Sequence, residues 1–270
     1  MTVASAFLVP SSPLPYFKAD NPPWSPLADA MADVGKRIAE INPDVLIFYP
    51  TTWNAVMDQL WQVRPHLEGI HVDHNWFEYG DLPYSFDTDT ELADACVRTA
   101  TERGVKSKGV DYDAFPIDTG TIVAMHYLNP EGKIPVVLVS NNLYHDAETT
   151  RDIAAIAVEQ ADEQGKKAVV VAIGELSGSF FRGDIDIETD HIVEKKEDGW
   201  NRKMLDYLES GDLSVFCASM DEYAKDAKVD YGFKHMHFLL SALNDKFSSS
   251  EVMAYAPLYG KGGAVVQMLP

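Results

Sequence analysis

Cysteine is scarce in this 270-residue sequence, which has only Cys96 and Cys217. Two cysteines cannot build the disulfide framework of a small secreted domain, so we expect a reducing, cytoplasmic location. No apolar run is long enough to cross a bilayer. Residues 1–9 are apolar but lack the basic start and cleavage pattern of a signal peptide, and they are typical of a first strand.

Basic residues are also few, because 22 Lys and Arg stand against 42 Asp and Glu, which gives a formal net charge of -20. Such a surface repels nucleic acid and anionic membranes, so we expect neither as a partner. What remains is an ordinary globular composition, with 46% hydrophobic and 24% charged residues. A chain of this length fits one α/β domain, and we expect residues 1–270 to form it.

Two apolar runs each end in a loop that contains proline. Residues 5–9 lead into Pro10, and residues 45–49 lead into Pro50. Between them, residues 25–41 carry an apolar stripe at helical spacing, which predicts a strand–helix–strand start and a parallel strand pair. Ligands of open α/β sheets bind beyond strand ends, so both loops are candidate site segments.

Later segments continue the same alternation, and the fold class we predict is α/β, with a central mixed, mostly parallel sheet flanked by helices. Helices are predicted at residues 53–60, 90–103, 148–163, 200–208, 213–223 and 232–243, and strands at 133–140, 167–173, 252–256 and 264–268.

Histidines and acidic residues give weaker signals. His71, Asp73 and His74 form the most metal-like cluster, although a surface hairpin with scattered polar residues explains them equally well. His235 and His237 are two residues apart on a predicted helix and point roughly 200° apart, so they cannot chelate one metal. We interpret them as core or interface residues.

The two proline loops read Pro10-Ser11-Ser12-Pro13 and Pro50-Thr51-Thr52-Trp53. Here the sequence resembles the class III extradiol ring-cleaving dioxygenases, in particular the heteromeric branch that opens aminophenol rings. In the catalytic members, the corresponding loops read roughly Pro-His-Pro-Pro and Ser-Pro-His-Trp, and both histidines bind ferrous iron. Ser11 and Thr52 stand at those positions in this chain.

Three further positions carry the resemblance. Thr119, in Asp118-Thr119-Gly120-Thr121, stands where some members have a functional histidine. Gly178 follows Leu176-Ser177, where catalytic members carry an acid/base histidine, and glycine has no side chain to transfer a proton. The best register places Ala227 at the position of the carboxylate ligand.

The resemblance implies a subunit with no catalytic and no metal-binding residues and with no cofactor of its own. It also implies a homologous catalytic β subunit that holds Fe(II) and the aromatic substrate, in an assembly that we expect to be α2β2. Neutral hydroxyls are poor substitutes for the two histidines and one carboxylate that ferrous iron requires.

Two alternatives stay open. The chain could be an active dioxygenase whose ligands are relocated to His145 with His71, His74 or His126 and an acidic residue. It could instead keep a vestigial pocket that binds a regulatory small molecule, unless side chains have filled that pocket. The candidate pocket residues are Tyr49, Trp53, Thr119, Tyr144, His145 and Phe180. His145 follows a strand end, although Asp146 beside it is also suited to cap the next helix.

Overall fold

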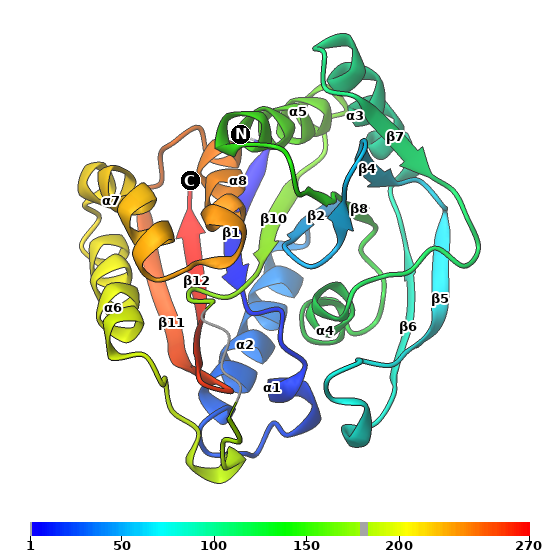
Figure 1. The fold of residues 1–270 in the computed structure, drawn as a ribbon. Coiled ribbons are helices and arrows are strands. Elements are labelled where there is room, and N and C mark those ends of the chain that lie inside the picture. The colour runs from blue at the N-terminus through cyan, green and yellow to red at the C-terminus, as the bar shows by residue number, and fades with distance from the viewer. Residues whose placement is uncertain (1, 179–182) are drawn as a thin grey trace.

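A six-stranded sheet forms the centre of the computed structural model, which describes residues 2–178 and 183–270 (Figure 1). Its strand order is β11-β12-β1-β10-β2-β8. The last four strands of this order run parallel, and β12 pairs antiparallel with both β1 and β11. The predicted mixed α/β sheet is therefore confirmed. Its strands are β1 (Val3–Val9), β2 (Val45–Pro50), β8 (Val136–Leu138), β10 (Ala168–Ile173), β11 (Ser249–Leu258) and β12 (Lys261–Leu269).

Helices cover both faces of the sheet, as Figure 1 shows. One face packs against α1 (Leu14–Phe17), α2 (Ser25–Ile41) and α4 (Thr119–Leu128). The other face packs against α3 (Thr90–Glu102), α5 (Ala147–Glu163), α6 (Lys195–Glu209), α7 (Leu213–Asp226) and α8 (Lys234–Ala242). Successive residues of a strand point to opposite faces, which is why an unbroken apolar strand such as β2 contributes to both cores.

Strands β1 and β2 are parallel, but they are not neighbours, because β10 lies between them and pairs with both. The register aligns Val9 with Ile173, and Ile173 with Pro50. Three loops therefore leave the same edge of the sheet side by side. This arrangement brings residues 10–13, 50–53 and 174–178 together, although they are far apart in the sequence.

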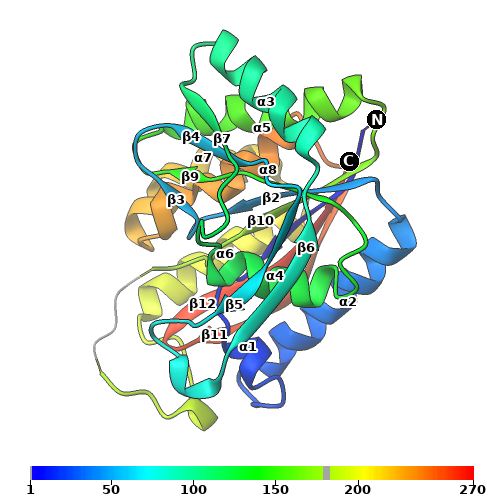
Figure 2. The ribbon, with the colours of Figure 1, turned by 90° about the vertical axis from the view of Figure 1, so that its right-hand side faces the viewer.

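The helix predicted at residues 53–60 is wrong. The segment instead contributes β3 (Asn54–Ala55), which pairs with β9 (Asn141–Asn142), and the start of β4 (Gln59–Gln62), which pairs with β7 (Ser107–Val110). Figure 2 shows these pairs beside the hairpin of β5 (His66–His71) and β6 (Leu82–Asp87). Pairing with distant backbone overrides the local helical preference here. Within residues 2–178 and 183–270 there are also three short 3-10 helices: η1 (Phe77–Tyr79), η2 (Ile187–Thr189) and η3 (Asp230–Phe233).

Within the described residues, no helix combines the length and apolarity needed to cross a lipid bilayer.

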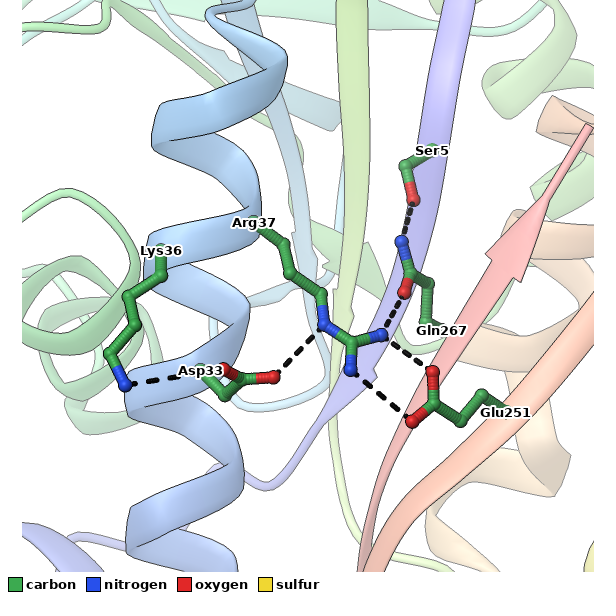
Figure 3. A network of polar contacts seen from close by, with 6 residues as sticks. All are labelled: Ser5, Asp33, Lys36, Arg37, Glu251 and Gln267. Atoms are coloured by element: carbon green, nitrogen blue, oxygen red, sulfur yellow. Dashed lines mark hydrogen bonds and ion pairs between the residues drawn. The ribbon is translucent and has the colours of Figure 1, made fainter.

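A polar network fastens α2 to the antiparallel edge of the sheet (Figure 3). The guanidinium of Arg37 donates to Asp33 on its own helix, to both carboxylate oxygens of Glu251 on β11, and to the side-chain oxygen of Gln267 on β12. Gln267 in turn donates to the Ser5 hydroxyl at 3.0 Å. The hydrogen bond to Glu251 raises the pKa of Arg37, and the same contact lowers the pKa of Glu251.

We expect Arg37→Lys to lower the free energy of unfolding by about 1 kcal/mol, because a single ammonium cannot reproduce the forked contacts of a guanidinium. Thermal melting at low and high salt measures the loss. Lys36→Arg is the matched control, because Lys36 lies on the same helix turn but is 4.0 Å from Asp33 and largely exposed. Equal melting temperatures for wild type and Arg37→Lys would contradict a stabilising role of the network.

Candidate functional site

Ser11, at the first candidate position, is hydrogen-bonded to a carboxylate from the neighbouring strand end. Glu175 follows β10 and accepts three hydrogen bonds, from the backbone N–H groups of Ser11 and Ser12 at 3.1 and 3.0 Å and from the Ser11 hydroxyl at 2.7 Å. Both Ser11 and Glu175 are buried. The Ser11 hydroxyl is therefore committed to an internal acceptor.

The second position, Thr52, is engaged in the same way. Its hydroxyl donates to the Asp118 carboxylate at 2.6 Å, and Asp118 also caps α4 by accepting from the backbone N–H and hydroxyl of Thr121. Burial raises the pKa of Asp118, while the hydrogen bonds from Thr121 and Thr52 act against that rise. A Cβ added to Gly120 would lie 2.9 Å from the Ser11 Cβ and 3.1 Å from Asp118 Oδ2. Ser11 is therefore close to Asp118, the hydrogen-bond partner of Thr52.

The third and fourth positions, Gly178 and Ala227, also lie together. The backbone N–H of Gly178 points to the Ala227 carbonyl oxygen at 3.4 Å, and Ala227 is fully buried after α7. A Cβ added to Gly178 would lie 2.8 Å from Asp230 Oδ1 and 2.3 Å from the Lys228 carbonyl oxygen. The space beside Gly178 is thus taken by the residues that follow α7.

Asp230 completes the filling of this region. Burial and the neighbouring carboxylate of Glu175 raise the pKa of Asp230 from 3.8 to about 7, although Lys261 opposes the shift. Protonated Asp230 shares a side-chain hydrogen bond with Glu175. Asp230 therefore keeps its proton well above the pH at which an ordinary carboxyl group loses it. We call the seven residues Ser11, Thr52, Asp118, Glu175, Gly178, Ala227 and Asp230 the strand-end cluster.

The shifted pKa of Asp230 predicts a pH-dependent stability. The folded chain keeps this proton up to about pH 7, whereas the unfolded chain releases it near the ordinary value of 3.8. Stability from this group therefore falls as pH rises between those values and then levels off. Asp230→Asn keeps a donor toward Glu175 and removes the titration.

We expect the melting temperature of Asp230→Asn to exceed that of wild type by a margin that is small at about pH 4 and largest above about pH 7. Thermal melting across this range measures it. The exposed Asp20→Asn provides the control for a lost negative charge. Parallel pH profiles for wild type and Asp230→Asn would show that the proton is not held as described.

Thr119 lies in a second polar chain beside the cluster. Its hydroxyl donates to Asp73 Oδ2 at 2.7 Å and contacts His71 Nε2 at 2.8 Å. Since the single hydroxyl proton goes to Asp73, the imidazole N–H of His71 is the donor in the second contact. The structure thus joins His71 and Asp73 through Thr119. His74 is not part of this chain and contacts the Asn75 side chain.

The remaining candidate pocket residues do not converge. Tyr49 is buried in one core, where it stacks on Phe238 with ring centroids 4.5 Å apart. Trp53 is buried in the core on the opposite face of the sheet and donates to the Pro116 carbonyl at 3.0 Å. Tyr144 is 80% exposed. Phe180 lies outside the described residues.

His145 is half-buried, and burial together with the nearby Lys234 ammonium lowers its pKa. The alternative prediction for this segment is confirmed, because the Asp146 side chain caps α5 by accepting from Thr149 N–H at 2.8 Å. His126, a second candidate for a relocated ligand, stacks on Tyr16 with centroids 4.6 Å apart. In the chain outside residues 1 and 179–182, no three His, Cys, Asp or Glu side chains are grouped to hold a metal ion.

His235 is fully buried and His237 partly so, as expected for core histidines. Burial and the proximity of His237 lower the pKa of His235 to about 3, so this imidazole is neutral.

Sequence reasoning missed Glu175 and Asp230, which fill the cluster. An available signal was Glu175 itself, a carboxylate placed directly after a buried strand and Gly174.

Comparisons with known proteins agree with this architecture. The family model described as the catalytic LigB subunit of aromatic ring-opening dioxygenase matches residues 9–267. The alpha subunit of 2-aminophenol 1,6-dioxygenase from a Pseudomonas species is 44% identical over 268 residues, which cover 99% of this chain and 99% of that protein. The beta subunit from a Pseudomonas species is 25% identical over 285 aligned residues, covering 98% of this chain and 93% of that protein.

Two other proteins extend the comparison. A 3,4-dihydroxyphenylacetate 2,3-dioxygenase of Escherichia coli is 24% identical over 240 residues, covering 86% of each chain. The crystal structure of an uncharacterized protein from Escherichia coli K12 has the same fold, with a TM-score of 0.66 and 13% identity over 98% of this chain and 99% of that one.

Proposed function

Because this chain belongs to the family of catalytic LigB subunits of aromatic ring-opening dioxygenases, we propose that it is the non-catalytic subunit of a heteromeric 2-aminophenol 1,6-dioxygenase. In this proposal, the ring of 2-aminophenol is opened with O2 at a homologous subunit that holds Fe(II). The beta-type relative, which aligns with 98% of this chain, supports a partner built on the same scaffold. We expect two copies of each subunit in the assembly.

The filled strand-end cluster is the observation that carries the proposal. Extradiol chemistry needs two histidines and one carboxylate around an iron that keeps open positions for substrate and oxygen. Ser11, Thr52 and Ala227 offer no imidazole or carboxylate, and the two hydroxyls already donate to Glu175 and Asp118. These residues do not fit a ferrous ion.

A base for proton transfer is missing from the expected position as well. Gly178 has no side chain, and the adjoining space is occupied by Asp230 and the Lys228 carbonyl. Asp230 is itself hydrogen-bonded to Glu175 and is partly buried. In this proposal, the ring-opening chemistry therefore belongs to the partner subunit.

The proposal also includes the domain organisation and the cellular location of the chain. We infer that residues 1–270 act as one domain, because helices on both faces share the same central sheet. We place the protein in the cytoplasm, which is supported by two unpaired cysteines, one buried and one exposed.

Anaerobic addition of excess ferrous iron to the purified chain, followed by desalting and metal analysis, tests the absence of a site. We expect iron far below one atom per chain, because the residues at the ligand positions cannot coordinate it, and even changing a residue that only supports a metal ligand typically costs about 10- to 100-fold in metal affinity. Stoichiometric retained iron would contradict the proposal and would favour ligands relocated to other histidines.

A further inference from the structure

Five exposed apolar side chains gather beside the strand-end cluster. We call Val56, Met57, Leu143, Tyr144 and Tyr231 the strand-end patch; between 40% and 80% of each is exposed. We propose that this patch is the docking surface for the homologous iron-bearing subunit, an inference that rests on the proposed function. Solvent-exposed apolar residues that gather in one place, rather than singly, are typical of interaction sites.

Strand pairing brings two parts of the patch together. β3 and β9 run parallel, with Asn54 opposite Asn141 and Ala55 opposite Asn142. The next residues along both strands, Val56 and Leu143, therefore lie side by side, and the backbone N–H of Leu143 donates to the Ala55 carbonyl at 2.9 Å. Figure 2 shows the two strands together at one edge of the molecule.

Tyr231 joins the patch from a different part of the chain. Its hydroxyl accepts a hydrogen bond from the Asn54 side chain at 3.1 Å. It also directly follows Asp230, so the patch borders the filled cluster. A subunit seated here would lie next to the strand-end cluster.

The backbone beneath the patch is fixed before any partner arrives. The Asn142 side chain accepts from Tyr144 N–H at 3.0 Å and donates to the Asp58 carbonyl at 3.1 Å. The Lys234 ammonium donates to the Asn142 carbonyl at 2.8 Å. Exposed aromatic side chains on a rigid backbone lose little conformational entropy on binding, which favours their use as binding hot spots.

Charged side chains of both signs lie beside the patch. Asp58, next to Met57, is held by both Lys106 and Lys108 at 2.9 Å, and these two lysine side chains are largely exposed. These lysines supply positive charge beside Met57, whereas the exposed Asp146 places a negative charge near Tyr144.

A homologous subunit is favoured over a second copy of this chain. Relatives of this chain are named as alpha and beta subunits of one enzyme, and the beta-type relative spans 98% of this chain. A stable interface needs roughly 800 Å² per partner, so the five residues would form its apolar centre, with polar residues at the rim.

Co-expression with the beta subunit of the Pseudomonas enzyme tests the inference. We expect wild type to form a complex, and both Tyr144→Glu and Met57→Glu to weaken it by roughly 30-fold or more, measured as a dissociation constant by biolayer interferometry. Tyr112→Glu is the matched control, because Tyr112 is 69% exposed but is not part of the patch. It should bind like wild type. Melting temperatures of the isolated variants verify that they are folded.

The outcomes separate the two proposals. A wild-type complex that tolerates both patch substitutions would overturn the docking surface while leaving the proposed function intact. No complex with wild type would contradict the proposed function itself. A dimer of this chain alone that Tyr144→Glu dissociates would assign the patch to a second copy, and would also overturn the inference.

Discussion

Gly178→His is expected to destabilise the chain severely rather than restore a catalytic histidine. Even the Cβ of a new side chain would lie 2.3 Å from the Lys228 carbonyl oxygen and 2.8 Å from Asp230 Oδ1. Backbone cannot yield at that distance without shifting the segment after α7. We expect a loss of about 3 kcal/mol or more in the free energy of unfolding, measured by chemical denaturation.

Gly178→Ala should already show a large part of this loss, because the Cβ alone makes the clash. Gly199→Ala is the matched control within α6, where an added Cβ meets no atom within 4 Å. It should stabilise the chain by up to about 1 kcal/mol, since alanine favours helix over glycine. A Gly178→His variant as stable as wild type would mean that the space beside Gly178 is open.

Glu175→Ala is the second substitution with a large expected effect. It leaves the backbone N–H groups of Ser11 and Ser12 and the Ser11 hydroxyl without their shared acceptor. Each unsatisfied buried donor costs about 1–3 kcal/mol, while relief of the repulsion between Glu175 and Asp230 returns part of the total. We expect a net loss of about 3 kcal/mol.

Chemical denaturation at about pH 7 measures this loss, and Glu175→Gln should give a smaller one because an acceptor oxygen remains. Glu188→Ala, at an exposed position, is the control and should stay within about 0.5 kcal/mol of wild type. If Glu175→Ala has the same free energy of unfolding as Glu188→Ala, then the Glu175 carboxylate does not hold the loop after β1.

Much of the fold could be predicted from the sequence, because its signals are local. Apolar runs bounded by proline mark β1 and β2, and the stripe at helical spacing marks α2. Strand order is a non-local property, which is why the insertion of β10 between β1 and β2 has no signature in either strand. The helix prediction for residues 53–60 was wrong for the same reason, since the pairing partners of this segment are about 50 to 90 residues away.

For the candidate site as well, local features could be predicted from the sequence and long-range contacts could not. The motifs placed Ser11, Thr52 and Gly178 at positions that the structure brings to neighbouring strand ends. The carboxylates that accept hydrogen bonds from Ser11 and Thr52 could not be predicted, because Glu175 is 164 residues from Ser11 and Asp118 is 66 residues from Thr52. The aromatic pocket prediction joined Tyr49 and Trp53, whose side chains enter opposite cores, because residues four apart on a strand and in the loop after it need not share a face.

In the proposed enzyme, this chain supports ring opening without holding the iron. The most direct measurement is iron content together with 2-aminophenol-dependent oxygen uptake, for this chain alone, for the beta-type subunit alone and for the co-purified complex. We predict that the chain alone has neither iron nor activity, and that the complex has iron in proportion to the beta-type subunit and the highest activity. Stoichiometric iron with oxygen uptake in this chain alone would contradict the account.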